Sequence, residues 1–331
     1  NLSADRDSAS LNMLFLNRHI EKAMELAGEI LFRPVFPEKE LSLMMKKRLA
    51  GYRISREKVQ NIASDSFFES VFGSNHPYGR PVKEKDFEAI TPALVRDFHS
   101  EYYTPRNMAA IISGKIHEDT PHLFEKHFGS FSDSKLPAGN SLNIINVSDA
   151  GKIHIEKPEA VQTAIRIGSA TINKRHPDYP GLKILNTILG GYFGSRLMKN
   201  IREDKGYTYG IHSSVTSLDQ SGYKVISTET GKQYCTSAIN EIYREISILQ
   251  KEPVKNDELE VVRNYMSGEM VRMFDGPFAI ADSFKAVWEF GLDFSYFNRM
   301  METVKTIGPE EIMRLANLYY NIDDLHEITA G

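Results

Sequence analysis

The chain has 331 residues, of which 41% are hydrophobic and 25% are charged, and its formal net charge is −4. This composition is typical of a globular protein of about two domains and excludes a disordered or low-complexity chain. Acidic and basic residues are mixed along the chain, so we expect no nucleic acid partner. We expect no membrane span, since no apolar run approaches the roughly 20 residues required. The single cysteine, Cys235, excludes an internal disulfide and a cysteine-rich metal centre.

Apolar residues at helical spacing predict helices in the first part of the chain. Residues 17–32 form one such helix, which Pro34 ends, and a second helix opens at Glu40-Leu41. A further helix is predicted from Pro92 to Tyr102-Tyr103. Residues 106–114 form a short apolar run that ends at a glycine, and this pattern predicts a β-strand.

The later part of the chain shows strands first and then helices. Residues 133–150 are rich in Ser, Asn, Gly and Pro and are predicted to be a linker. Residues 161–169 and 222–230 alternate between apolar and polar side chains, as strands do. Helices are predicted at 234–250, from Glu258-Leu259 and from Pro309 to Tyr319-Tyr320. The aromatic residues Phe284, Trp288 and Phe290 are predicted to be buried.

These elements recur in the same order, which indicates an internal repeat. Pro92 and Pro309 lie 217 positions apart, and each opens a helix that ends at a Tyr-Tyr pair. The predicted fold is therefore α+β, with two homologous domains that each have a largely antiparallel sheet and helices on one face. We assign the domains to residues 1–140 and 141–331. Matching the start of the second copy to the first places it about 65 residues before Asn1, so the first domain is expected to be incomplete.

Two histidine patterns come close to helical zinc motifs without matching them. His117-Glu118 is followed by His122, and His122 by Glu125 and His127, so the paired histidines are five positions apart. A helical zinc site needs histidines four apart, on one face of the helix. We interpret both sets as surface residues rather than metal ligands. His76-Pro77-Tyr78-Gly79 predicts a turn.

The segment 189–212 has the most informative chemistry. Gly190 and Gly191 end one helix, Ser195 could cap a second, and Lys205-Gly206 ends that one. Arg202 lies near the end of the second helix, and Tyr209 lies just beyond it. A guanidinium and a phenol placed together can donate hydrogen bonds to a carbonyl oxygen or a developing oxyanion. The residue types alone favour the alternative, in which the arginine caps the helix and the tyrosine packs in a sheet.

The stretch GGYFGSRLMKNIREDKGYTYGI resembles the second-domain signature of the M16 zinc metallopeptidases. This family is insulinase- and pitrilysin-like, and the chain resembles its bacterial two-domain type, related to the mitochondrial processing peptidase. FRPVFPEKEL, FGSNHPYGRPV and YYTPRNMAAIISG are similar to first-domain patterns. In the family the second domain supplies an Arg and a Tyr, seven residues apart, that bind and polarise the substrate backbone. The resemblance thus implies that Arg202 and Tyr209 are catalytic and substrate-binding residues.

The chain differs from the family at the zinc ligands. The resemblance implies an HxxEH motif, which these 331 residues do not contain, and a third ligand, a glutamate, near Gly51 or Tyr52. The window Leu49 to Ile54 has no carboxylate, and Glu57 lies further along the chain. We therefore expect no metal ligand and no cofactor in this chain. Zinc is expected in a partner subunit or in a segment before Asn1, and the chain alone is expected to be inactive.

The resemblance implies a subunit of an M16-type peptidase that cleaves unfolded peptides. In this interpretation Arg202 and Tyr209 bind the substrate and stabilise the oxyanion, while a homologous zinc-bearing subunit completes a hetero- or homodimer. One alternative is a complete zinc peptidase whose HxxEH segment lies outside this chain. Another is a non-enzymatic structural or binding homologue of the processing peptidase. The subtype favours the bacterial periplasm over the cytoplasm.

Overall fold

The computed structural model describes residues 1–129 and 150–331. The chain divides into two compact units, one of Asn1–Ile54 with Val82–Ser141 and the other of Ser55–Pro81 with Leu142–Gly331. The predicted linker at 133–150 lies almost entirely outside the described residues. The domain boundary at 140/141 stays a prediction, and each unit is described by itself.

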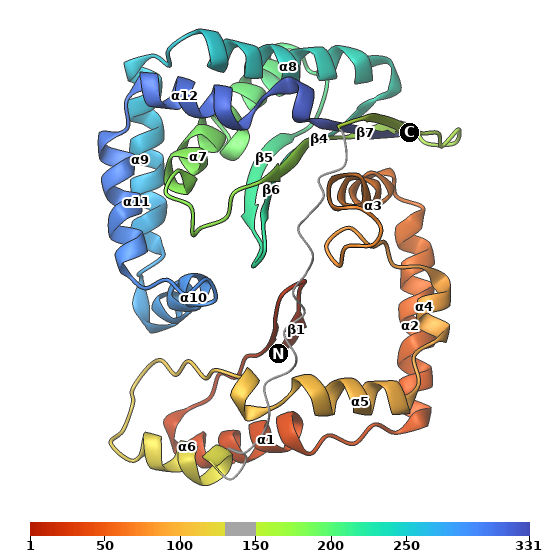
Figure 1. Ribbon diagram of the computed structural model, residues 1–331, viewed down its shortest axis with the longest axis vertical. Coiled ribbons are helices and arrows are strands. Elements are labelled where there is room, and N and C mark those ends of the chain that lie inside the picture. Colours follow the sequence, from red (N-terminus) through yellow and green to blue (C-terminus); the bar gives the residue numbers. More distant parts are fainter. Residues whose placement is uncertain (130–149) are drawn as a thin grey trace. The chain divides into compact units, whose positions relative to one another are not determined.

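A five-stranded sheet forms the centre of the second unit (Figure 1). Its order is β3-β7-β4-β6-β5, with β3 (Lys152–Ile155) parallel to β7 (His326–Ala330) and the other neighbours antiparallel. β4 (Gln162–Thr171) and β6 (Gly222–Gly231) match the two predicted strands, and β5 (Ile211–Ser217) lies at the edge. The predicted α+β class with a largely antiparallel sheet is confirmed.

One face of this sheet is covered by the larger hydrophobic core. Ile165, Ile167 and Ile226 point into it from β4 and β6, because alternate residues of a strand share a face. α7 (Tyr179–Asn186), α8 (Cys235–Lys251) and α12 (Pro309–Tyr319) supply the opposing side chains. These helices place the segment after α7 directly against the sheet.

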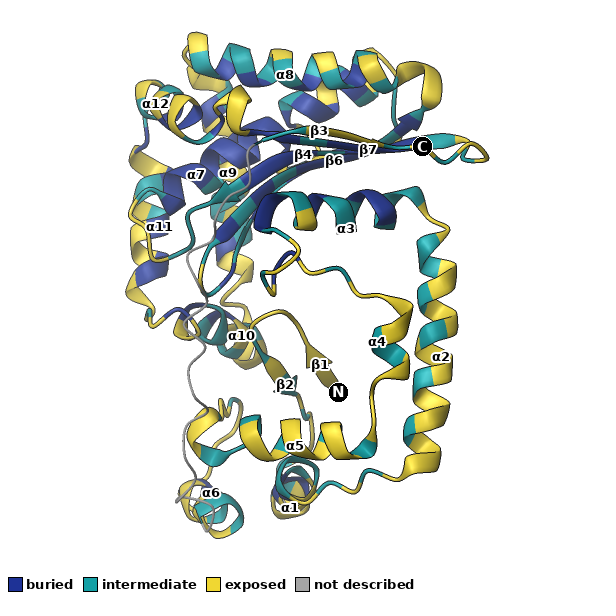
Figure 2. Ribbon diagram, turned by 45° about the vertical axis from the view of Figure 1, so that its right-hand side comes forward, coloured by how far each residue is buried: buried dark blue, intermediate teal, exposed yellow. Residues whose placement is uncertain are grey.

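The other face of the sheet is covered by α3 (Val59–Phe72), a helix of the first repeat copy (Figure 2). Phe67 and Val71 of α3 are buried with Ala164 and Ile328 of the sheet. Ser70 Oγ lies 2.7 Å from His326 Nδ1 of β7. α3 therefore belongs to the second unit by packing, although by sequence it is part of the first copy.

The predicted turn at His76–Gly79 is present and fastens the end of α3. Tyr78 is 2% exposed within the same core, and its hydroxyl oxygen accepts a hydrogen bond from Gln220 N at 3.3 Å. A Cβ on Gly79 would lie 2.8 Å from Phe68 O, which leaves room only for glycine. The turn thus has a structural role.

The remaining helices of the second unit complete the larger core, in which Val287 and Phe297 are buried. They are α9 (Asn256–Arg272), α10 (Gly276–Trp288) and α11 (Ser295–Thr306), together with the short 3-10 turns η6 (Lys232–Tyr234) and η7 (Ile322–Asp324). Phe290 is buried as predicted, but Phe284 is only half-buried and Trp288 is 46% exposed. The prediction for Trp288 was wrong because only Ser283 and Val287 of α10 are buried, so one face of the helix stays open.

The first unit is mainly helical. It contains a hairpin of β1 (Leu2–Ala4) and β2 (Ala9–Leu11), a 3-10 turn η1 (Asn17–His19) and the helices α1 (Ile20–Phe32), α2 (Glu38–Arg56), α4 (Glu84–Glu88), α5 (Pro92–Tyr102) and α6 (Thr120–Phe128). α1 packs on α6, where the rings of Phe32 and Phe128 lie 5.9 Å apart. The helices predicted at 17–32, after Glu40 and after Pro92 are thus confirmed.

The strand predicted at 106–114 is not formed. The segment begins with a 3-10 turn, η2 (Pro105–Asn107), and residues 108–113 have no regular structure. An isolated strand cannot satisfy its backbone hydrogen bonds, and no described strand of this unit pairs with the segment. The side chains of Ile111 and Ile112 are consequently 37% and 42% exposed.

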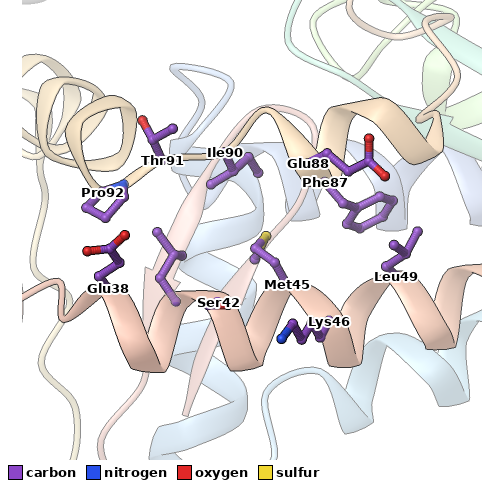
Figure 3. A pocket seen from close by; sticks show the side chains of 11 residues that line it. Glu38, Ser42, Met45, Lys46, Leu49, Phe87, Glu88, Ile90, Thr91 and Pro92 are labelled. Carbon is purple, nitrogen blue, oxygen red and sulfur yellow. The ribbon is translucent and has the colours of Figure 1, made fainter.

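A shallow groove of about 300 Å³ runs along α2 in the first unit (Figure 3). Its apolar walls come from successive turns of α2 and from the stretch between α4 and α5. The lining residues include Leu41, Met45, Leu49, Phe87, Ile90 and Pro92. In the second unit, α9 packs on α11, and Arg263 Nη2 of α9 donates a hydrogen bond to Ile307 O, directly after α11, at 2.5 Å.

Candidate functional site

Two π-helices flank the turn that begins the candidate segment. η4 (Thr187–Gly191) continues α7, and η5 (Met198–Asp204) follows the turn at 192–195. π-helices are rare and often occur at functional sites, because the wider winding changes the direction of the side chains. The sequence predicted helices here, but apolar spacing does not distinguish α from π winding over so few turns. The sequence analysis therefore did not predict the π-helices.

Gly190 lets η4 lie directly against β5. A Cβ at this position would lie 2.7 Å from both the nitrogen and the Cβ of Ser213. Asn186 Nδ2 donates a hydrogen bond to Ser213 O at 3.0 Å, which joins the same two elements. The cap suggested for Ser195 is not made, since its buried hydroxyl has no hydrogen-bond partner among the described residues.

η5 is held firmly on its inner side. Leu197 and Ile201 are fully buried in the larger core. Asn200 Nδ2 donates hydrogen bonds to Glu241 Oε2 at 3.0 Å and to Glu245 Oε1 at 2.6 Å, both on α8. These contacts fix the backbone of η5 and leave its outer side to carry Arg202.

Arg202 is half-buried on η5, and its guanidinium lies over an aromatic ring. The guanidinium carbon is 4.7 Å from the centroid of Phe193, which projects from the turn between the two π-helices. Among the described residues, no hydrogen bond or ion pair engages this guanidinium. The arginine does not cap the helix, so its N–H donors are available to a ligand.

Arg196, the other arginine of the segment, is used differently. Its Nε and Nη2 donate to the two carboxylate oxygens of Glu258 at 2.7 Å each. Both side chains are largely buried, so this bidentate pair is structural. The contrast distinguishes Arg196, which ties η5 to α9, from Arg202, whose donors are free.

Tyr209 is exposed on a loop whose backbone is fixed. Gly206 makes the turn after η5 with φ of 65°, and Tyr207 N donates to Ile201 O at 3.0 Å. Thr208 Oγ1 donates to Glu229 O of β6 at 2.7 Å. Tyr209 itself is 94% exposed, and its phenol has no hydrogen-bond partner among the described residues. It does not pack in a sheet, contrary to the structural alternative.

Arg202 and Tyr209 therefore lie on consecutive elements of one anchored segment. The polar group of each side chain has no hydrogen-bond partner among the described residues. The two side chains make no direct contact with each other. Their functional roles stay a prediction at this point.

His212 is a candidate that the sequence analysis did not single out. It lies on β5, three residues after Tyr209, and pairs across the sheet with Ser227, which also pairs with Arg166 of β4. Burial lowers the pKa of His212, and the nearby Arg166 charge lowers it further, so both favour the neutral ring. Only the strand register brings these three residues into one row, which is why spacing could not reveal it.

The region where the family would place its third zinc ligand holds no suitable group. Tyr52 donates from its hydroxyl to Val82 O at 2.9 Å, and Arg53 pairs with Glu84 at 2.7 Å. Glu57 lies beyond the end of α2, where Lys157 pairs with it at 2.6 Å and holds its carboxyl pKa below the ordinary value. These residues do not fit a zinc ion.

The other histidine patterns also form no metal site in the described part of the chain. No group of three or more His, Cys, Asp or Glu side chains in residues 1–129 and 150–331 could hold a metal ion. His117 lies in the turn before α6, and His122 and His127 lie on that helix.

A comparison with known families identifies the family of this chain. The model of the family described as "Peptidase M16 inactive domain" matches residues 89–266, more than half of the chain. The chain belongs to the M16 peptidase family. The matched region includes the two π-helices, Arg202 and Tyr209.

Relatives of this M16 chain are named zinc proteases. An uncharacterized zinc protease of Bacillus subtilis is 25% identical over 77% of this chain and 62% of its own length. One of Mycobacterium leprae is 28% identical over 62% of this chain and 47% of its own length. The chain thus spans about half to two thirds of these relatives.

Solved structures show the same fold. A peptidase M16 inactive domain of Pseudomonas fluorescens superposes with a TM-score of 0.82 at 23% identity, over 94% of this chain and 75% of that one. A protease of Helicobacter pylori gives 0.84 at 17% identity, over 95% and 77%. Across the described ranges of the M16 chain, no helix has the length and apolar character to cross a membrane.

Proposed function

We propose that this chain provides the substrate-polarising half of an M16-type peptidase active site. Arg202 binds a backbone carbonyl of an unfolded peptide, and Tyr209 donates a hydrogen bond to the carbonyl oxygen that becomes an oxyanion. The observation that carries the proposal is the free state of both groups on an otherwise rigid segment. Side chains that served only structure would be engaged, as Arg196 is.

The chemistry fits the positions. A phenol and a guanidinium are donors that keep their protons at neutral pH, so they can stabilise developing negative charge without a proton transfer. Donors fixed before the reaction stabilise the transition state most, because no reorganisation is needed when the charge develops. Asn200, two residues before Arg202, and Thr208, the residue before Tyr209, hold the backbone next to each member of the pair.

The zinc ion of the reaction is proposed to lie outside the residues described here. The donor set around α2 does not fit the metal, since Tyr52 contacts Val82 and Arg53 pairs with Glu84 at the start of α4. A homologous subunit that carries HxxEH would complete the site, and the two chains would share the peptide. We derive no step at the metal from this chain.

A second candidate is a self-sufficient zinc protease of which this chain is a part. The observation that favours it is that the named relatives are zinc proteases and extend well beyond the matched region. Both candidates assign the same work to Arg202 and Tyr209. They differ only in whether zinc is held by the same polypeptide.

The test is peptide hydrolysis by the full-length protein, alone and mixed with an M16 subunit that carries HxxEH. Tyr209→Phe is expected to lower kcat by about 100- to 1,000-fold, the usual cost of losing one oxyanion donor. Arg202→Ala is expected to lower kcat/KM by a similar factor. Tyr319→Phe removes a phenol from α12 in the same unit and serves as the matched control, with activity unchanged.

Two outcomes decide between the candidates. Hydrolysis by the protein alone, abolished by a chelator, would support the self-sufficient protease. Hydrolysis only in the mixture would support the subunit. If Tyr209→Phe and Arg202→Ala both retained full activity wherever the wild type is active, the proposed role of the pair would be wrong.

A further inference from the structure

Phe193 is an exposed aromatic residue directly beside Arg202. Its ring is 64% exposed, which is costly for a side chain of this size, and it lies under the guanidinium at 4.7 Å. Nothing in the core of the unit requires a large apolar side chain at this position, so its contact with Arg202 needs an explanation.

The geometry of a guanidinium supplies that explanation. The group is planar, and its five N–H donors all lie in the plane, while the face carries none. An aromatic ring beside the group attracts its positive charge through the ring quadrupole and needs no hydrogen bond to do so. A carboxylate partner would instead occupy two donors, as Glu258 does for Arg196.

The turn that carries Phe193 is itself fixed. Ser195 N donates to Tyr192 O at 3.1 Å, and the Tyr192 ring packs on Tyr265 of α9 with centroids 4.9 Å apart. A Cβ on Gly194 would lie 2.8 Å from the Tyr192 ring, so the close turn needs glycine there. Phe193 is thus presented on a rigid support rather than on a free loop.

We propose that Phe193 is a positioning residue for Arg202: its ring holds the guanidinium through its positive charge and leaves the N–H donors for the peptide backbone. This inference rests on the proposed function, because it concerns how Arg202 is prepared for substrate. Phe193 takes no part in the reaction and acts only through the arginine.

The first experiment replaces the ring while keeping its apolar volume. Phe193→Leu removes the quadrupole and is expected to raise KM for unfolded peptides by about two- to five-fold, the size of an exposed cation–π contact, with kcat little changed. Phe193→Tyr and Phe193→Trp keep a ring and are expected to restore the wild-type KM. Phe278→Leu, at an exposed phenylalanine of α10, is the matched control and is expected to have no effect.

A double-mutant cycle separates positioning from a general structural effect. In an Arg202→Ala background, Phe193→Leu is expected to cause no further change, because the group it positions is gone. A structural role would lower activity by the same factor in both backgrounds. Proton NMR of the arginine side chains gives an independent readout, since the ring current of Phe193 shifts the Arg202 resonances and Phe193→Leu would remove that shift.

The possible failures are distinguishable. If Arg202→Ala itself leaves hydrolysis unchanged, the proposed function fails, and the NMR shift alone then tests the contact. If Arg202→Ala lowers hydrolysis but Phe193→Leu behaves as the wild type, only the positioning role of Phe193 is overturned. A loss from Phe193→Leu that persists in the Arg202→Ala background also overturns it.

Discussion

α3 and α10 occupy the same place in the two copies of the repeat, yet α3 is a core helix and α10 a surface helix. Val59 and Gly276, where they begin, lie 217 positions apart. Phe72-Gly73 ends the first helix and Phe290-Gly291 follows the second, and both glycines have positive φ, 81° and 68°. α3 buries residues along its whole length, whereas α10 buries only Ser283 and Val287.

The difference is made by the surface that each helix meets. α3 packs on the five-stranded sheet of the second unit through Phe67 and Val71. α10 has no such sheet against it within its unit, so Phe278 stays 59% exposed and Trp288 46%. An apolar helix face can be buried, but the surface that packs against it determines whether it is buried.

A second pair of equivalent segments gives the same lesson for strands. Ile111 and Ile328 are also 217 positions apart. Ile328 lies on β7 between β3 and β4 and is fully buried, whereas Ile111 lies in an irregular segment and is 37% exposed. The first segment is the more apolar of the two, AAIIS against HEITA, but only the second has strands on either side with which to form hydrogen bonds.

The largest change in the free energy of unfolding is expected when α3 is compared with α10. Phe67→Ala in α3 should lower the free energy of unfolding by about 3–5 kcal/mol, because it removes a fully buried ring and leaves a cavity. Phe278→Ala in α10 should change it by less than about 0.5 kcal/mol. Urea unfolding followed by circular dichroism measures both. Equal effects would mean that α10 is covered in solution.

Smaller changes in the free energy of unfolding are expected when Ile328 is compared with Ile111. Ile328→Ala should cost about 2–5 kcal/mol, since the side chain is sandwiched between the sheet and α3. Ile111→Ala should again lie within about 0.5 kcal/mol. Amide hydrogen exchange supplies the backbone counterpart, with strong protection at β7 and weak protection at 108–113. Strong protection at 108–113 would contradict the irregular structure assigned there.

The smallest effect concerns pH and the contact between α3 and the sheet. Burial lowers the pKa of His326 below its ordinary value of 6.5, and the charge of Lys224 lowers it further. The unfolded chain therefore binds a proton that the folded chain does not, and stability is lost as the pH falls through 6.5 toward the folded pKa. At neutral pH and above, this loss is absent.

His326→Asn keeps a polar atom near Ser70 Oγ but does not titrate. The variant should lose less stability than the wild type between neutral and mildly acid pH, as measured by unfolding midpoints across that range. Parallel profiles for the two proteins would mean that His326 does not contribute to the acid sensitivity. The first copy has Ala109 at the equivalent position and so contributes nothing comparable.

Much of the candidate site could be located from the sequence. The glycine pair, the helix after it and the seven-residue spacing of Arg202 and Tyr209 are local features. Three parts could not be predicted: the π winding of η5, the row of Arg166, Ser227 and His212, and the ring of Phe193 under the guanidinium. Each depends on how one element lies against another.

The sequence by itself determined the helices, the repeat and the family, because helical periodicity and turn residues act over a few positions. It predicted β4 and β6 for the same reason, since alternation along a strand is local. Tertiary structure alone decided that 108–113 forms no strand, that α3 joins the second unit and that Arg202 keeps its donors free. Strand pairing, burial and ring contacts need partners distant in sequence, and local patterns do not say whether those partners are present.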